Sequence, residues 1–128
     1  MPEIQEVEAE IQPMFSADAI RYGDLLFVSG CVPMDTDGKL VGEGDLEQQT
    51  RKVMENLETV LKTAGSDCSK ILKTTVFMTD ISRRKIPDAI RREYFQEHRP
   101  ASTIVEVTAL TAEGIEIEIE AIATVPVG

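Results

Sequence analysis

The sequence contains few of the residues that metal and redox chemistry require. Its 128 residues include two cysteines, one histidine and no tryptophan. Cys31 and Cys68 lack a Cys-x-x-Cys spacing and are too few for a disulfide scaffold, so we expect two free thiols, at least one of them buried. His98 has no cysteine or second histidine at a spacing that would form a zinc site. The sequence therefore predicts no metal centre.

Positive charge is also scarce. The chain has 13 Lys and Arg residues against 23 Asp and Glu residues, which gives a net charge of −10. Surfaces that bind nucleic acid are rich in Lys and Arg, so this balance argues against a nucleic-acid partner. One local basic group is interpreted as a solvated face of an acidic protein, with the rim of an anionic-ligand site as the alternative. It comprises Arg83, Arg84, Lys85, Arg91 and Arg92.

Long apolar runs are absent as well. No segment approaches the roughly 20 apolar residues of a membrane-spanning helix, and the acidic N-terminal segment lacks the basic-then-apolar order of a signal peptide. We therefore expect a cytoplasmic protein with no membrane partner. Hydrophobic residues make up 42% of the chain and charged residues 28%, as in ordinary globular proteins. This length and composition predict a single domain over residues 1–128.

Apolar residues that alternate with polar ones predict six strands. The most regular is the last, over residues 115–123, where three isoleucines and an alanine share one face. A run rich in β-branched residues predicts a well-buried strand over residues 71–78. The other strands are expected at residues 4–11, 19–21, 25–29 and 103–107.

Capping residues and helical spacing predict two helices. Asp45 is a suitable N-cap for the first, with Gln48 three residues later and Gly65 just after its end. The second should begin near Pro87 and end before Pro100. The resulting order, β-β-β-α-β-α-β-β, predicts an α+β fold in which a mixed sheet carries two helices on one face.

The second face of this sheet is expected to be partly apolar, because the strands carry more large apolar residues than one buried face needs. Packing of that face against other copies of the chain would remove it from water. The residues concerned are Leu25, Phe27, Val76, Met78, Val105 and Val107.

Three glutamates share one face of the last strand. Glu116 and Glu118 are interpreted as solvated side chains. Glu120 precedes a small apolar end of the strand, so we expect it at the point where the strand becomes buried. A carboxylate at such a point is either satisfied by backbone donors or acts as a general base.

Three segments carry a resemblance to a known family. They are residues 23–30 (GDLLFVSG), residues 49–77 (with the motifs QT, NL, AG and KTTVF) and residues 94–123 (with YF, PAST, VEV and IEIEAIA). In these segments, which together span most of the chain, the sequence resembles the Rid family of small proteins, also called the YjgF/YER057c/UK114 family.

This resemblance implies a chorismate-mutase-like fold and a homotrimer in which three sheets form a barrel-like core. It also implies clefts between neighbouring subunits that bind a small-molecule metabolite. The implied activity is the hydrolysis of reactive enamines and imines, such as 2-aminoacrylate and 2-iminopropanoate, to a 2-keto acid and ammonia without a cofactor. Some family members carry an endoribonuclease label, so an RNA-cleaving or chaperone-like role is a further alternative.

The resemblance implies two principal site positions. Active family members bind the substrate carboxylate through an arginine in a Pro-Ala-Arg-Ser/Thr segment, and Ser102 occupies that position in Pro-Ala-Ser-Thr here. Glu120 is the glutamate that the resemblance implies as the catalytic residue. Because a serine hydroxyl carries no charge, a non-catalytic ligand-binding or regulatory trimer is the alternative to an enzyme.

Other ligand-binding positions also follow from the resemblance. One is a tyrosine position after the first strand, another is a Ser-Gly-Gln segment, and a third is an asparagine on the second helix. The corresponding residues in this sequence are Phe15 or Ser16, then Ser29, Gly30 and Cys31, and finally Asp88.

Overall fold

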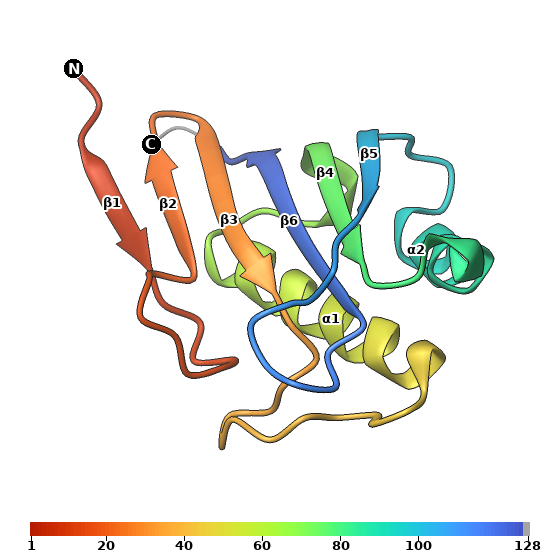
Figure 1. Cartoon of the computed structure of the whole chain (residues 1–128). Coiled ribbons are helices and arrows are strands. Elements are labelled where there is room, and N and C mark those ends of the chain that lie inside the picture. Colours follow the sequence, from red (N-terminus) through yellow and green to blue (C-terminus); the bar gives the residue numbers. More distant parts are fainter. Residues whose placement is uncertain (127–128) are drawn as a thin grey trace.

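The computed structural model describes residues 1–126 and has the predicted order of strands and helices (Figure 1). Two short 3₁₀ turns, Cys68–Lys70 and Ile81–Arg83, precede β4 and α2. The strands are β1 (Ile4–Val7), β2 (Ala19–Tyr22), β3 (Leu25–Cys31), β4 (Ile71–Met78), β5 (Ala101–Glu106) and β6 (Ile117–Thr124). The helices are α1 (Leu46–Thr63) and α2 (Lys85–Phe95).

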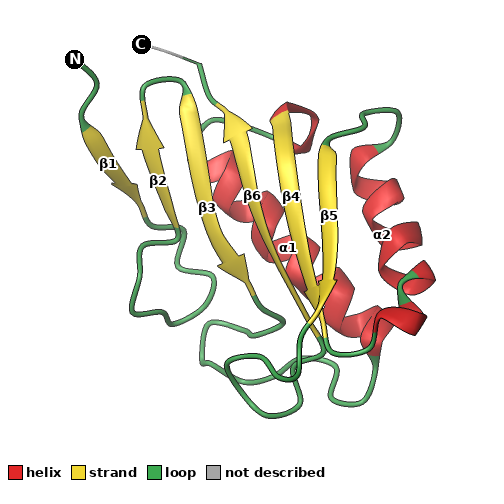
Figure 2. Cartoon of the chain, turned by 45° about the horizontal axis from the view of Figure 1, so that its top comes forward, coloured by secondary structure: helices red, strands yellow, loops and turns green. Residues whose placement is uncertain are grey.

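The six strands form one mixed sheet with the order β1-β2-β3-β6-β4-β5. All neighbouring strands are antiparallel except β4 and β5, which are parallel and are joined through α2. A parallel connection needs such a crossover, because a tight hairpin can only reverse the chain. Both helices lie on one side of the sheet and leave the other side open (Figure 2). The last strand, β6, therefore occupies the centre of the sheet between β3 and β4.

Helix α1 begins and ends as its sequence predicts. The Asp45 carboxylate accepts a hydrogen bond from the backbone N–H of Gln48 at 3.0 Å, which satisfies one of the free donors of the first turn. Gly65 follows the helix with φ of +84°, a left-handed conformation that favours glycine. The apolar stripe of α1 packs on β3 and β6 and is fully buried at Val53 and Leu57.

Strand β6 confirms the alternation predicted for it. Ile117, Ile119 and Ala121 are buried beneath the helices, each at 4% exposure or less. The strand begins at Ile117 rather than at residue 115, because the backbone N–H of Glu116 donates to the side chain of Gln49 instead of a neighbouring strand. Strand β1 likewise ends at Val7, and the left-handed φ of +54° at Glu10 interrupts the extended chain beyond it.

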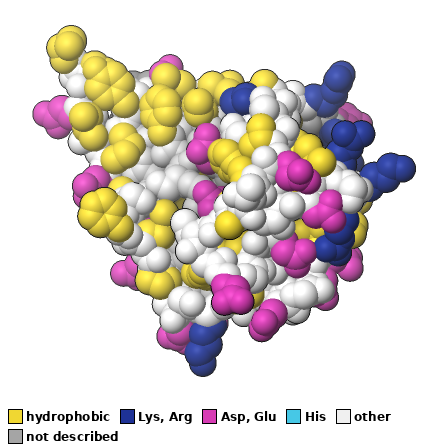
Figure 3. Space-filling view, in the orientation of Figure 1, with side chains coloured by type: hydrophobic (Ala, Val, Ile, Leu, Met, Phe, Trp, Pro, Cys, Tyr) yellow, Lys and Arg dark blue, Asp and Glu magenta, His cyan; other side chains and the backbone are white. Residues whose placement is uncertain are grey.

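The open face of the sheet carries an apolar row. Phe27 is 43% exposed and lies directly opposite Ile20 on one side and Ile122 on the other. Figure 3 shows apolar side chains gathered on this face over the first strands. Val76 and Met78 were expected to contribute to this face, but they are buried on the helix-covered side because they fall in register with the buried positions of β6.

The side chain of Gln49 ties three backbone segments together. Its amide nitrogen donates to the carbonyls of Gly42 and Gly114, at 3.1 and 2.9 Å, and its oxygen accepts from Glu116 N at 2.8 Å. Gln49 is fully buried, so water cannot replace these bonds if the amide is removed. Gln49 therefore holds two connections against α1, the one from β3 to α1 and the one from β5 to β6.

Replacing Gln49 with methionine is expected to lower the free energy of unfolding by about 1–3 kcal/mol, the cost of leaving buried backbone groups without partners. Methionine has a similar volume, so the loss is not due to a cavity. The measurement is urea denaturation of the variant beside Gln48→Met, in which the neighbouring glutamine is exposed. Equal stability of the two variants would contradict this role.

Among residues 1–126, no helix is long and apolar enough to cross a lipid bilayer. Both cysteines are unpaired and buried, which agrees with the prediction of free thiols.

Candidate functional site

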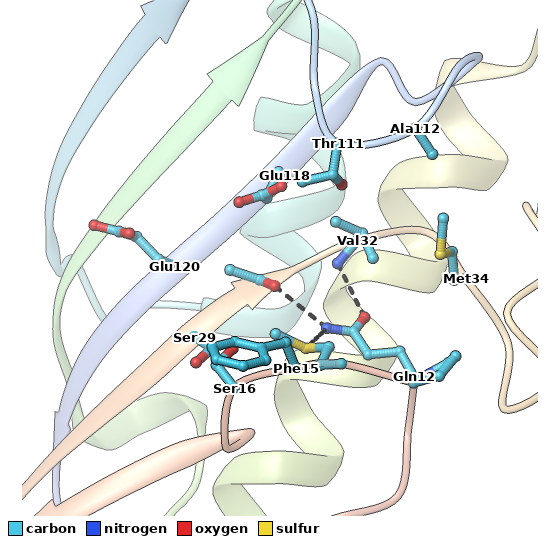
Figure 4. Close-up of a pocket in the computed structure, with 13 residues that line it drawn as sticks. Gln12, Phe15, Ser16, Ser29, Val32, Met34, Thr111, Ala112, Glu118 and Glu120 are labelled. Atoms are coloured by element: carbon cyan, nitrogen blue, oxygen red, sulfur yellow. Dashed lines mark hydrogen bonds between the residues drawn. The ribbon is translucent and has the colours of Figure 1, made fainter.

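A pocket of about 620 Å³ opens on the uncovered side of the sheet, where β3 and β6 meet the loops that precede β2 and β6. Five of the predicted site residues line it: Phe15, Ser16, Ser29, Gly30 and Glu120. Figure 4 shows Glu118 and Glu120 projecting from β6, with Phe15, Ser16 and Ser29 on the adjoining segments. The structure thus brings together residues that are separated by about a hundred positions in the chain.

Hydrogen bonds between the loop before β2 and the end of β3 form one wall of this pocket. The Ser29 hydroxyl donates to the carbonyl of Ala17 at 2.7 Å. The Gln12 amide donates to the carbonyl of Gly30 and accepts from the backbone N–H of Val32, at 3.3 and 3.1 Å. The hydroxyl oxygen of Ser29 keeps its acceptor capacity for a ligand, because its own hydrogen is used within the wall.

Glu118 is the carboxylate most closely enclosed by this pocket. Burial, followed by the charge of Glu120, raises the pKa of Glu118 above its ordinary value. Its carboxylate lies over the backbone of Gly30, where even a methyl group would collide with it. Figure 4 also shows Thr111, from the connection before β6, beside Glu118. A carboxylate with a raised pKa beside a pocket is suited to receive and return a proton.

The three glutamates of β6 therefore differ from the sequence interpretation. Glu120, expected at the buried end, is exposed, whereas Glu116 and Glu118 are partly buried. Glu116 is held in an ion pair with Arg83 at 2.9 Å. The burial gradient runs opposite to the expected direction because the loops that cover β6 lie at its start. Alternation along the strand predicts which face of the sheet each glutamate occupies. It cannot predict where loops from distant parts of the chain cover that face.

Cys31 does not line the pocket, although the resemblance implied that it would. A bulge in β3 between Val28 and Cys31 moves Cys31 to the helix-covered side, opposite Ile119. Its side chain is only 1% exposed. Burial, together with the charges of Asp18 and Glu118, raises the pKa of the Cys31 thiol well above its usual range, so the thiol is not activated as a nucleophile.

Ser102 and Asp88 line a different pocket, of about 320 Å³, between α2 and the edge strand β5. Ser102 pairs with Thr74, whose side chain is fully buried under the helices, so both project from the helix-covered side. Glu118 and Glu120 project from the opposite side of the sheet. Within one chain, the predicted ligand-binding residues therefore form two separate groups.

The sequence did not place Arg91 among the predicted site residues. Its basic group was interpreted as a solvated face, with the rim of an anionic-ligand site as the alternative, yet the Arg91 side chain is only 9% exposed. Its guanidinium donates to Thr74 Oγ1 and to Ser102 Oγ, at 2.9 and 2.8 Å, and desolvation lowers its pKa. The available signal was its spacing: Pro87, Arg91 and Phe95 recur every four residues, which places Arg91 on the buried stripe of α2.

Within residues 1–126, no group of three metal-ligating side chains comes together. The His98 ring lies 2.7 Å from the carbonyl of Ile71, a contact that fastens the segment after α2 to the start of β4.

Sequence comparisons relate the chain to proteins of one family. The family model described as endoribonuclease L-PSP matches residues 6–125. A RutC family protein of Pyrococcus horikoshii is 37% identical over 107 residues, which cover 84% of each chain. The 2-iminobutanoate/2-iminopropanoate deaminase of Rattus norvegicus is 35% identical over 107 residues, covering 84% of this chain and 77% of the rat protein.

Solved structures give the same relationship. A conserved Rid-family protein of unknown function from Yersinia pestis superposes with a TM-score of 0.89 at 38% identity, covering 96% of this chain and all of the Yersinia chain. A YjgF/YER057c/UK114 family member from Mycobacterium tuberculosis superposes with a TM-score of 0.83 at 31% identity, covering 96% of this chain and all of the other.

Proposed function

The chain belongs to the endoribonuclease L-PSP family, which includes the Rid (YjgF/YER057c/UK114) proteins, and from this membership we propose that it hydrolyses small reactive enamines or imines. The products are a 2-keto acid and ammonia, and the substrates are of the 2-aminoacrylate and 2-iminopropanoate type. The observation that carries the proposal is the enclosed Glu118 carboxylate, with its raised pKa, at the wall of an open pocket.

The chemistry requires one water molecule and one group that moves protons. An iminium carbon is already electrophilic, so no metal or cofactor is needed to activate it. Glu118 accepts a proton from water as the water oxygen forms a bond to the carbon, which gives a carbinolamine. Glu118 then returns the proton to nitrogen, and the C–N bond breaks as the hydroxyl oxygen forms the C=O bond of the keto acid. The hydroxyl proton passes through the Glu118 carboxylate to the departing ammonia, which leaves as ammonium. A pKa raised by burial suits both halves of this transfer.

We further propose that the site is completed in a homotrimer of chorismate-mutase-like subunits with a barrel-like core. Two features support this assembly. Ser102 and Glu118 project from opposite sides of the sheet, so one small ligand reaches both only between two copies. The open face also carries the apolar row of Ile20, Phe27 and Ile122, with Phe27 exposed and the two isoleucines half-buried, and contact with neighbouring copies would remove this row from water.

A non-catalytic ligand-binding trimer is the second candidate, because position 102 lacks the arginine of active family members. RNA cleavage has less support. The net charge of −10 and the two carboxylates at the pocket would repel a polyanion.

A trapping assay tests the proposed activity. A pyridoxal-phosphate dehydratase generates 2-iminopropanoate from serine, and semicarbazide captures the imine before it hydrolyses. The protein is expected to lower the rate of semicarbazone formation in proportion to its concentration, because it converts the imine to pyruvate first. A rate that stays unchanged at every protein concentration would contradict imine hydrolysis for this substrate.

A further inference from the structure

Arg91 is a cation held almost entirely away from water. Its side chain, 9% exposed, reaches from α2 to the edge of the sheet, where its guanidinium donates to the hydroxyls of Thr74 and Ser102. It also lies 5.7 Å from the centre of the Phe95 ring. Two hydroxyls and one ring fix the position of the guanidinium without neutralising its charge.

The charge of Arg91 is poorly balanced within the described chain. The nearest carboxylate, Asp88, is 3.5 Å away and its side chain is 48% exposed. Nε of Arg91 is buried and has no hydrogen-bond partner among residues 1–126. Taking a cation out of water is costly unless an anion and a full set of hydrogen bonds replace the water. The guanidinium therefore has both the charge and the free donors to bind an anion.

Arg91 lies in a pocket whose size and positive charge suit a small anion. The pocket of about 320 Å³ contains three arginines, Arg91, Arg92 and Arg99, against the single carboxylate of Asp88. This local excess of positive charge stands out in a chain whose net charge is −10. Arg92 is held in place because its guanidinium donates to the carbonyls of Gln96 and His98. The pocket is thus preorganised for a small anion.

We infer that this pocket binds a small carboxylate and that Arg91 supplies, from α2, the positive charge that position 102 lacks. Ser102 contributes to the same site. Its oxygen accepts hydrogen bonds from Arg91 and Thr74, so its own hydrogen is free to point at the ligand. The identity of the carboxylate rests on the proposed function: it is the carboxylate of a 2-imino acid whose reacting carbon faces Glu118 of a neighbouring copy.

Binding of 2-oxobutanoate, a stable keto acid of the product class, tests the inference directly by calorimetric titration. Arg91→Gln is expected to weaken binding about 30-fold or more, the effect of removing a buried charged partner. Asp88→Asn is expected to tighten binding several-fold, because the carboxylate that lines the pocket and competes with the ligand for Arg91 loses its charge. Arg84→Gln, an exposed arginine outside this pocket, serves as the matched control and should leave binding unchanged.

Two further titrations test whether the pocket selects a carboxylate. The neutral methyl ester of 2-oxobutanoate should bind no more than weakly, and inorganic phosphate should bind less tightly than the carboxylate. Tighter binding of phosphate, equal binding of the ester, or unchanged affinity in Arg91→Gln would overturn the inference. The gain of affinity in Asp88→Asn keeps the test informative if Arg91→Gln misfolds, because misfolding cannot tighten binding.

The result is separable from the proposed activity. Carboxylate binding that depends on Arg91, without imine hydrolysis, supports this site while contradicting the deaminase. Conversely, imine hydrolysis with the same KM in wild type and Arg91→Gln supports the deaminase and overturns the role of Arg91.

Discussion

Replacing Glu118 with glutamine is expected to lower the rate of imine hydrolysis by about 10²–10⁴-fold, the contribution typical of a positioned general base. Glutamine keeps the size and the hydrogen-bonding shape of the side chain but cannot accept the proton of the attacking water. The trapping assay with semicarbazide measures this loss. KM should change less than kcat, because the carboxylate moves protons during the reaction and does not hold the substrate.

The same substitution is expected to make the fold more stable at neutral pH. Burial and the charge of Glu120 raise the pKa of Glu118 in the folded chain above its value in the unfolded chain, about 4.3. The folded state therefore binds the proton more tightly. Its stability falls as pH rises from the unfolded pKa through the folded one. Glutamine carries no charge, so its advantage should be present at pH 7 and absent below about pH 4.

These two effects have opposite signs, which removes unfolding as an explanation for the lost activity. Urea denaturation of wild type and Glu118→Gln at pH 4 and pH 7 measures the stability difference. Glu120→Gln is the matched control, since Glu120 lies two residues away on the same face but is exposed. If Glu120→Gln abolishes hydrolysis while Glu118→Gln remains active, the general base is Glu120, as the resemblance implied.

Much of the fold could be predicted because its signals are local. The N-cap Asp45 and the glycine at position 65 define the ends of α1 through interactions within a few residues. The alternation in β6 reflects a central strand that has one face under helices. Such patterns need no knowledge of distant segments, and the predicted element order was confirmed.

The site was less predictable because it depends on distant segments and on irregular backbone. A bulge in β3 reverses the side on which Cys31 lies, and the local signal for it, Gly30 within the strand, was interpreted as the end of the strand instead. The burial of Glu118 depends on the connection between β5 and β6, residues 107–116, which folds back over β6. Arg91 was misassigned because a charged side chain on a helix is usually solvated, whereas here two hydroxyls and a ring receive it.

Replacing Phe27 with glutamate is expected to dissociate the proposed trimer. The solution mass should fall from three times the 14.1 kDa chain mass to that of a single chain. Phe27 lies in the middle of the apolar row, directly opposite Ile20 and Ile122, so a carboxylate there would be buried without a partner in the assembly. Light scattering coupled to size-exclusion chromatography measures the mass.

The isolated chain should remain folded, because Phe27 is 43% exposed on the open face and contributes little to the core beneath the helices. Leu72→Glu is the matched control: Leu72 is similarly exposed, at 47%, but lies outside the row. If Phe27→Glu keeps the wild-type mass in solution, the open face does not form the interface between copies. A folded single chain that also loses imine hydrolysis would instead show that Glu118 and the Arg91 pocket act together only across two copies, since one chain holds them on opposite sides of its sheet.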